Sequence, residues 1–290
     1  MKTASINDDY RRIGEQIAVL LGRPRVTGLY LPEPVEDETF RDEFGFVFLA
    51  DDGIGPFYVS MQDILPRLWQ RYPKPERCSE DAIALLQGFA STDPSDRALA
   101  LGTYNALSAR LYRAAGFEPP DRKPNSGLID MPPGLPVGMV GYFSPLVEKL
   151  TAQGYEVMVL ERSPERVPER PGVSVTCDPR ELTRCRHLLC TASTLINDSL
   201  EDILAVTEPQ ACLEIVGPSG SGLPDPLLAR GVTSIGGVSF GDRNDLLNHL
   251  RRGGSWGEAG RKYQLDAGNY PGLAQLITRL TDRRGDTSQS

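Results

Sequence analysis

The sequence predicts an α/β protein in which a Rossmann-like parallel sheet, with helices on both faces, follows a smaller α+β domain. Two observations lead to this prediction. After residue 136, short apolar runs that do not alternate with polar residues are interspersed with helix-like segments, which is typical of a parallel sheet covered on both faces. Before residue 119, three strand-like runs precede helix-like segments, which is the layout of an α+β fold.

A proline-rich stretch separates these two parts. Residues 119–136 contain Pro119, Pro120, Pro124, Pro132, Pro133 and Pro136. Because each proline fixes its φ angle and lacks an N–H group, this stretch is not expected to form a helix or an inner strand. We therefore expect an α+β domain at residues 1–118, a linker at 119–136 and a Rossmann-like domain at 137–285.

Local signals define the elements of the N-terminal part. Asp51-Asp52-Gly53 is a hairpin signal between two apolar runs. Ser79 is a candidate helix N-cap, and Gly116 is a candidate C-cap. The predicted helices span 9–21, 79–89 and 96–115, and the predicted strands span 26–31, 44–50 and 54–60.

The C-terminal part is expected to contain six strands and five helices. The strands are short apolar runs, and the helices follow from longer segments with polar and apolar residues on different faces. The predicted strands span 137–140, 157–160, 173–176, 188–191, 212–216 and 233–236, and the predicted helices span 145–152, 200–206, 226–230, 242–252 and 272–282.

Composition excludes several classes of protein. The net charge of −8 argues against a nucleic-acid surface, which needs clustered Lys and Arg. No apolar stretch approaches the roughly 18 residues needed to span a bilayer, so we expect no membrane partner. The polar N-terminus lacks the apolar core of a signal peptide, and the five cysteines show no disulfide spacing. A cytoplasmic protein is expected, and apolar runs in the N-terminal part suggest a homodimer.

A glycine turn after the first C-terminal strand is the most informative feature. Residues 137–143 (VGMVGYF) place Gly138 and Gly141 around the strand end, and Tyr142 and Phe143 follow directly. The next apolar run ends on Glu161. Such a turn lets a polar group approach a helix N-terminus, and the acid can bind a ribose. The spacing is G-x-x-G and not G-x-G-x-x-G, so the pattern favours a Rossmann-like ligand site over an NAD site in particular.

Two further polar loops follow apolar strands. Thr191, Ser193, Thr194 and Asn197 form the first, and Gly217-Pro218-Ser219 opens the second. Hydroxyl, amide and backbone N–H groups at strand ends can bind phosphate or carboxylate. The alternatives are local turn hydrogen bonding for the first loop and a flexible connection for the second. Because the carboxyl ends of parallel strands meet at one edge of a sheet, these loops should cluster with Gly141 and Glu161.

Asn105 lies inside a predicted helix, where Asn is a middling helix former and needs a reason for its presence. It either faces a ligand in a cleft between the domains or ties the helix to a sheet.

Few residues of this chain are candidate metal ligands. Cys185, His187 and Cys190 are close in sequence and of a type that binds soft metals, but no C-x-x-C spacing exists. Oxygen donors from Glu161, Asp198 and Asp202 are an alternative.

The C-terminal motifs resemble the putative heavy-metal chelation domain family, a domain of unknown function. The resemblance rests on segments 137–143, 159–161, 190–197 (CTASTLIN), 216–219 (VGPS) and 231–237, which occur in the family's order. Segment 100–107 (ALGTYNAL) resembles the enolase N-terminal-like domain that often precedes this family. The resemblance implies two domains with a cleft between them, and a role in metal chelation or in metal-cofactor metabolism.

Three functional hypotheses follow. The first is a small-ligand-binding protein with its site at the interdomain cleft, acting in heavy-metal chelation or metal-cofactor metabolism. The second is an enzyme that uses an adenosine-containing cofactor or nucleotide, with Glu161 on the ribose and the Gly138–Gly141 turn on the polar tail. The third is a non-catalytic dimeric scaffold. The sequence shows no catalytic triad, and it identifies neither the metal nor the substrate.

Overall fold

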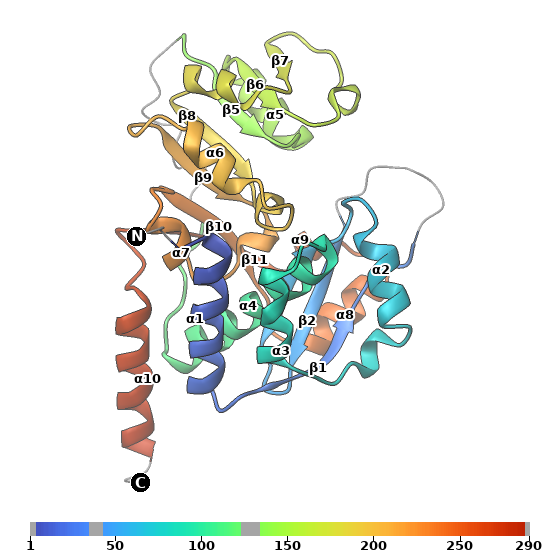
Figure 1. Ribbon diagram of the computed structural model, residues 1–290, viewed down its shortest axis with the longest axis vertical. Coiled ribbons are helices and arrows are strands. Elements are labelled where there is room, and N and C mark those ends of the chain that lie inside the picture. The colour runs from blue at the N-terminus through green and yellow to red at the C-terminus, as the bar shows by residue number, and fades with distance from the viewer. Residues whose placement is uncertain (1–3, 35–42, 123–133, 288–290) are drawn as a thin grey trace.

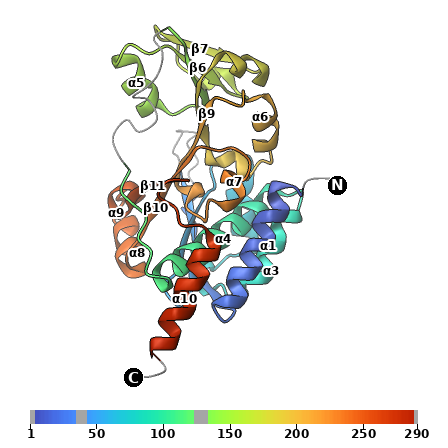
Figure 2. The same cartoon turned by 90° about the vertical axis from the view of Figure 1, so that its left-hand side faces the viewer.

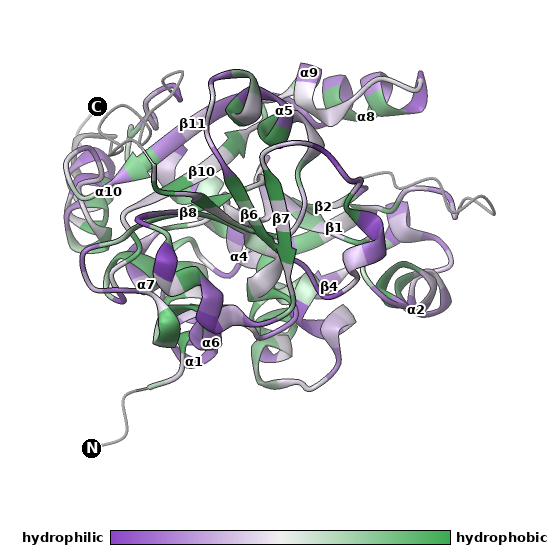
Figure 3. Cartoon of the chain, turned by 90° about the horizontal axis from the view of Figure 1, so that it is seen from above, coloured by the Kyte–Doolittle hydropathy of each residue, from purple (hydrophilic) through white to green (hydrophobic). Residues whose placement is uncertain are grey.

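The computed structural model describes residues 4–34, 43–122 and 134–287, and it contains two β-sheets surrounded by helices (Figure 1). The predicted fold class is confirmed, since a large, mostly parallel sheet accompanies a smaller antiparallel one. Seen from above, apolar strands run through the middle of the molecule and polar segments lie around them (Figure 3). Within the described ranges, none of the helices combines the length and the apolar character that a bilayer span requires.

The large sheet has seven strands in the order β11-β10-β9-β8-β5-β6-β7. All neighbouring pairs are parallel except β10 and β11, which run antiparallel. The strands are β5 (Val137–Val140), β6 (Val157–Leu160), β7 (Val173–Thr176), β8 (His187–Thr191), β9 (Cys212–Val216), β10 (Ser234–Ser239) and β11 (Arg261–Asp266).

The strand order reverses between β5 and β8. The chain builds outward from β5 through β6 to β7, and then returns to the other side of β5 with β8, β9 and β10. Doubly wound nucleotide-binding folds have the same order, and their ligands bind outside the carboxyl ends of the strands at the reversal. The topology therefore predicts a ligand site at the carboxyl ends of β5 and β8.

Both faces of the central strands are buried, which explains their continuous apolar sequences. On one face of the sheet, Val137 and Met139 of β5 pack into one hydrophobic cluster. On the other face, Val140, Met158 and Leu188 pack into a second cluster. Successive strand residues point to opposite faces, so burial on both sides requires apolar residues throughout. The helices of this part are α5 (Ser144–Ala152), α6 (Leu200–Val206), α7 (Asp225–Leu228), α8 (Arg243–Arg251), α9 (Trp256–Ala259) and α10 (Leu273–Thr287).

The smaller sheet is antiparallel, in the order β3-β2-β1-β4. Its outer strand β3 carries Pro56, in keeping with the confinement of proline to edge strands. The elements of the N-terminal part are β1 (Arg25–Tyr30), β2 (Phe44–Leu49), β3 (Ile54–Tyr58), β4 (Glu80–Asp81), α1 (Ile6–Leu20), α2 (Ile64–Arg71), α3 (Ala82–Leu86) and α4 (Pro94–Ala114).

Helix α4 is the central helix of the molecule. It contacts α1, α2, α3, β2 and β3 of the N-terminal part and α10 of the C-terminal part. Its approach to β3 depends on glycine, because a Cβ atom on Gly55 would overlap the backbone carbonyl oxygen of Gly102. The absence of a side chain at this position lets the helix backbone lie directly on the strand.

Helices of the C-terminal part cover the other face of the smaller sheet. Phe46 of β2 meets Phe240 edge to face, with 5.2 Å between the ring centres. The guanidinium of Arg243 on α8 lies 4.5 Å from the ring centre of Phe48. Figure 2 shows α8 and α9 on one side of the molecule and α1 and α3 on the opposite side. The N-terminal sheet is therefore enclosed by segments from both halves of the chain.

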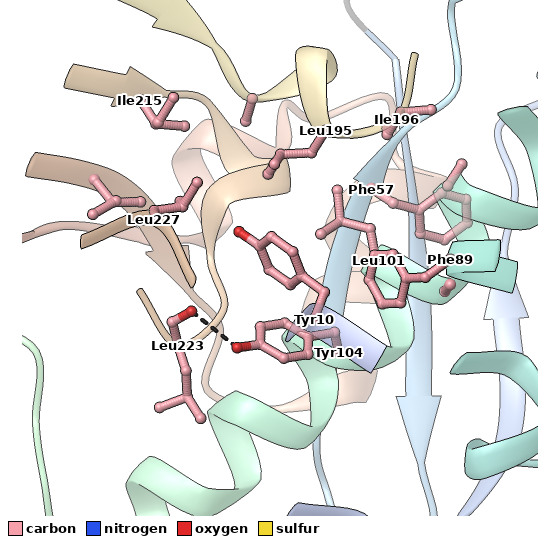
Figure 4. Close-up of a cluster of buried hydrophobic side chains, with 14 of the residues drawn as sticks. Tyr10, Phe57, Phe89, Leu101, Tyr104, Leu195, Ile196, Ile215, Leu223 and Leu227 are labelled. Carbon is pink, nitrogen blue, oxygen red and sulfur yellow. Dashed lines mark hydrogen bonds between the residues drawn. The ribbon is translucent and has the colours of Figure 1, made fainter. Parts of the chain in front are cut away.

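One hydrophobic cluster extends across the predicted domain boundary. It joins Tyr10 of α1 and Tyr104 of α4 to Leu195 and Leu223 of the C-terminal part (Figure 4). The hydroxyl of Tyr104 donates a hydrogen bond to the carbonyl oxygen of Leu223 at 3.0 Å. The division at 119–136 stays a prediction, and residues 123–133 of that linker lie outside the described residues.

Most predicted elements are confirmed to within a few residues, including the hairpin between β2 and β3. Three corrections are needed. The side chain of Asp81, not that of Ser79, caps α3 by accepting the N–H groups of Ile83 and Ala84. The predicted helix at 79–89 is shorter, because a 3-10 turn (Gln87–Ala90) follows α3. Helix α2, helix α9 and strand β11 were not predicted.

Candidate functional site

A cavity of about 920 Å³ lies at the carboxyl ends of the parallel strands. The last residues of four strands line it: Val140 of β5, Leu160 of β6, Thr191 of β8 and Val216 of β9. The opposite wall includes Phe44 of β2 and Tyr58 of β3. The cavity therefore lies where the strand order reverses, between the two sheets, and its volume is within the range of small-molecule sites.

The glycine turn and Glu161 are brought together as the sequence predicts. Gly141 has a φ of +81°, a conformation that favours glycine, and its N–H donates to the carbonyl oxygen of Leu160 at 2.9 Å. The Glu161 carboxylate accepts the backbone N–H of Tyr142 at 3.3 Å and that of Arg162 at 2.8 Å. Gly141, Tyr142, Phe143 and Glu161 all line the cavity.

The loop after β8 contributes Thr191, Ser193, Thr194 and Asn197 to the lining. These groups also bond to one another and to the loop backbone. The hydroxyls of Thr191 and Ser193 lie 2.9 Å apart, and the Thr194 hydroxyl donates to the carbonyl oxygen of Thr191 at 2.7 Å. The Asn197 side-chain oxygen accepts the hydroxyl and the N–H of Ser199. Local hydrogen bonds therefore hold the shape of this loop, which is the alternative role that the sequence offered for its polar groups. The same loop also lines the cavity.

The loop after β9 joins the two sheets. Gly217, at a φ of +114°, and Pro218 line the cavity. The buried hydroxyl of Ser219 accepts the backbone N–H of Tyr58 at 2.9 Å. This bond fixes the end of β3 against the end of β9, so the two walls of the cavity are connected at this point.

Two of the candidate ligand contacts lie outside the cavity lining. Gly138 is in the middle of β5, where a Cβ atom would press on Leu188 and Cys185. Its role is to permit close strand packing. Asn105 is buried in α4, and its side-chain amide donates to the carbonyl oxygens of Pro56 and Ser219 at 2.8 and 2.9 Å. It connects the helix to both sheets, which is the second of the two roles considered for it.

Sequence reasoning missed the cationic side chains of the cavity. Four cations line it (Arg122, Arg162, Arg166 and Lys262), against two carboxylates (Glu161 and Asp202). The lining thus has an excess of positive charge, although the whole chain has a net charge of −8. Arg122 pairs with the buried Glu214 at 2.6 Å. Arg162 and Lys262 have no carboxylate within 4.0 Å among the residues that the structure describes.

Within the described residues, the candidate metal ligands are not gathered into a group of three or more. Cys185 and Cys190 are both buried, and burial raises the pKa of the Cys185 thiol to about 11 and that of the Cys190 thiol to about 12. His187 lies at the start of β8, the opposite end of this strand from the cavity. In the described part of the chain, no group of three or more His, Cys, Asp or Glu side chains is placed to hold a metal ion, and this includes Asp198 and Asp202.

Comparison with known proteins finds a family match for the C-terminal part of the chain. Residues 126–267 match the model of the family described as "Putative heavy-metal chelation". This part of the chain belongs to that family. The chelation-family region contains all strands of the large sheet and every predicted cavity loop.

One curated relative and two solved structures are similar to most of this chain. An uncharacterized protein of Methanocaldococcus jannaschii is 25% identical over 237 residues, which is 80% of this chain and 90% of the relative. A family structure of unknown function from Pyrococcus horikoshii aligns with a TM-score of 0.65 at 19% identity, over 89% of this chain and 99% of that one. Another, from Desulfitobacterium hafniense DCB-2, aligns at 0.62 and 17% identity, over 89% and 98%. These structures show the fold, and the enolase N-terminal-like assignment stays a prediction.

Proposed function

We propose that the protein binds a small anionic molecule in the cavity at the carboxyl ends of β5, β6, β8 and β9. The charge of the lining carries this proposal. In a chain with a net charge of −8, four cationic side chains face the cavity against two carboxylates. The guanidinium of Arg162 and the ammonium of Lys262 have no carboxylate partner in the described residues, so both are available to pair with an anion.

The donor groups of the cavity also limit the form in which a metal could bind there. No three His, Cys, Asp or Glu side chains converge there in the described residues, so we expect a heavy metal to enter as a complex with a small anionic chelator. The chelator would supply the donors, and the protein would bind its carboxylate or phosphate groups. This arrangement reconciles the description of the family with the chemistry of the lining.

An adenosine-containing ligand is the second candidate, and the position of Glu161 supports it. It ends β6, beside the glycine turn that ends β5, and the strand order matches that of dinucleotide-binding folds. The bond from the Tyr142 N–H fixes one carboxylate oxygen toward the turn. In this candidate, the ribose hydroxyls bind Glu161 and the phosphates lie near Gly141 and Arg162.

A ligand screen with two matched variants tests the proposal. The metal-free protein is titrated with citrate, citrate with a divalent metal, inorganic phosphate and AMP, and the shift in melting temperature is recorded. A ligand at a hundred times its Kd should stabilise the fold by about 2.7 kcal/mol, or a few degrees. Arg162→Gln should weaken the binding of each active anion about tenfold, since a charge-assisted bond is lost. Arg252→Gln, which changes an exposed arginine outside the cavity, should leave binding unchanged.

The outcomes separate the candidates. A shift from AMP that Glu161→Ala abolishes supports the adenosine candidate, and a shift from citrate that needs the metal supports a chelate. The proposal fails when no anion shifts the melting temperature, or when Arg252→Gln weakens binding as much as Arg162→Gln does.

A further inference from the structure

The cavity has an aromatic end that the strand-end loops do not explain. Phe44 of β2 contacts Tyr58 and Trp256 edge to face, with ring centres 5.4 and 5.2 Å apart. All three rings line the cavity. Phe44 is buried, whereas Tyr58 and Trp256 retain part of their surface exposed. Three separate segments, two from the N-terminal sheet and one from α9, thus bring aromatic surface to one place.

Two polar groups at this end lack a hydrogen-bond acceptor or a carboxylate partner among the residues that the structure describes. The indole N–H of Trp256 makes no hydrogen bond with any residue that the structure describes. The ammonium of Lys262 lies 5.7 Å from the centre of the Trp256 ring and has no carboxylate within 4.0 Å in the same residues. The other tryptophan differs in this respect, because the indole N–H of Trp69 donates to the carbonyl oxygen of Pro32 at 2.9 Å.

Two glycines contribute backbone to the neighbouring wall of the cavity. Gly236 and Gly237 of β10 line it between the aromatic end and the loop after β9. At Gly237 a Cβ atom would press on the buried ring of Tyr263, and at Gly236 the nearest heavy atoms would be 3.6 Å or more away. At these two positions backbone contributes to the wall, next to the side chains of Val238 and Tyr263, which also line the cavity.

We infer that this end of the cavity is a subsite for a planar, anionic group, of which an aromatic carboxylate is the simplest example. The ring of such a group would pack edge to face or offset against Trp256, Phe44 and Tyr58. Its carboxylate would pair with the Lys262 ammonium and accept the Trp256 indole N–H. Trp256 and Lys262 are then the residues that determine specificity at this end, while Gly141 and Glu161 serve the other.

This inference rests on the proposed use of the cavity as a ligand site, and its test is independent of the strand-end loops. The chain has two tryptophans, so Trp69→Phe leaves Trp256 as the only indole fluorophore. The probes are benzoate and cyclohexanecarboxylate, which have the same charge and similar size but differ in planarity. Benzoate should change Trp256 fluorescence saturably and should bind about fivefold more tightly than cyclohexanecarboxylate, through aromatic packing beyond area burial.

Two lysine variants, one inside the cavity and one outside it, provide a test and its matched control. Lys262→Gln in the Trp69→Phe background should weaken the binding of both acids severalfold, because the charge partner of the carboxylate is lost. Lys149→Gln changes an exposed lysine on α5 outside the cavity and should leave both affinities unchanged. Since Lys262 is exposed, the variant should fold, and a urea unfolding curve verifies this.

Several results would overturn the inference: no saturable fluorescence change with benzoate, equal affinities for the two acids, or equal effects of the two lysine variants. Comparison of benzoate with the anions of the ligand screen identifies which proposal has failed. If benzoate fails while citrate or AMP still shifts the melting temperature, the aromatic subsite is wrong and the proposed function stands. If benzoate binds as expected while every anion of the screen fails, the strand-end site is wrong and the aromatic subsite stands.

Discussion

The side-chain amide of Asn105 donates a hydrogen bond to the carbonyl oxygen of Ser219 at 2.9 Å, across 114 residues of sequence. The same amide nitrogen donates to the carbonyl oxygen of Pro56 at 2.8 Å. One buried side chain on α4 therefore holds the edge strand of the smaller sheet and the loop after β9 of the larger sheet. Both of these segments continue into the walls of the cavity, so Asn105 sets the shape of the site without lining it.

Replacement of Asn105 by alanine should lower the free energy of unfolding by about 2–4 kcal/mol, because two buried carbonyl oxygens lose their donor. Urea unfolding measures this change. The control is Asn248→Ala, an exposed asparagine on α8 whose loss should change stability by less than about 0.5 kcal/mol. Equal effects of the two variants would contradict the structural role of Asn105.

The strands of the large sheet could be predicted because burial on both faces demands continuous apolar runs, and such runs are visible in sequence. The cavity loops followed from the same prediction, since each comes directly after a strand. Strand β11 escaped prediction for a physical reason. It is an antiparallel edge strand in which only Tyr263 and Leu265 are apolar, with Gln264 between them and charged residues on both sides, so the apolar signal is short and weak.

The aromatic end of the cavity could not be predicted from sequence. Phe44 and Tyr58 are ordinary strand residues of the N-terminal sheet, and Trp256 lies on a four-residue helix. They meet only because α8 and α9 pack against the smaller sheet, which is a tertiary contact between distant segments. The sequence does offer a structural role for Asn105, that of tying its helix to a sheet. It does not identify the two carbonyl partners, because they depend on how α4 packs between the sheets.

Gly55 provides a sharp test of the packing between α4 and β3. A methyl group on this residue would overlap the backbone of Gly102 and Ala106, which cannot move without shifting the helix. Gly55→Ala should therefore destabilise the protein by about 3 kcal/mol. At Gly241 a Cβ atom would meet nothing within 4 Å, so Gly241→Ala should change the unfolding free energy by about 0.5 kcal/mol at most. A Gly55→Ala protein as stable as Gly241→Ala would refute the close approach.

Two exposed cysteines allow ligand binding to be observed by alkylation. Cys177 lines the cavity, whereas Cys212 lies at the start of β9, away from it. Iodoacetamide should modify both in the native protein, while buried Cys78, Cys185 and Cys190 react only on unfolding. The anion that gives the largest thermal shift, at about ten times its Kd, should slow the reaction of Cys177 about tenfold and leave Cys212 unchanged. Equal rates for Cys177 with and without the anion would place the ligand elsewhere.

The ion pair between Arg122 and Glu214 predicts a pH-dependent stability. Burial raises the pKa of the Glu214 carboxyl above its ordinary value of 4.5, although Arg122 acts in the opposite direction. The folded protein therefore holds this proton to a higher pH than the unfolded chain does. Glu214 then contributes stability that is fully present below pH 4.5 and is lost as the pH rises through the folded pKa.

Glu214→Gln isolates this contribution, because glutamine does not titrate and still accepts a bond from Arg122. The free energy of unfolding of the unmodified protein, relative to that of Glu214→Gln, should fall as the pH rises above the ordinary carboxyl pKa of 4.5. Urea unfolding at several pH values measures the difference, in which the other groups cancel. Arg122→Gln removes the cation that lowers the pKa of Glu214, so the fall should shift to higher pH and grow. A difference that rises with pH would mean that the pKa of Glu214 is lowered, and that pairing with Arg122 outweighs burial.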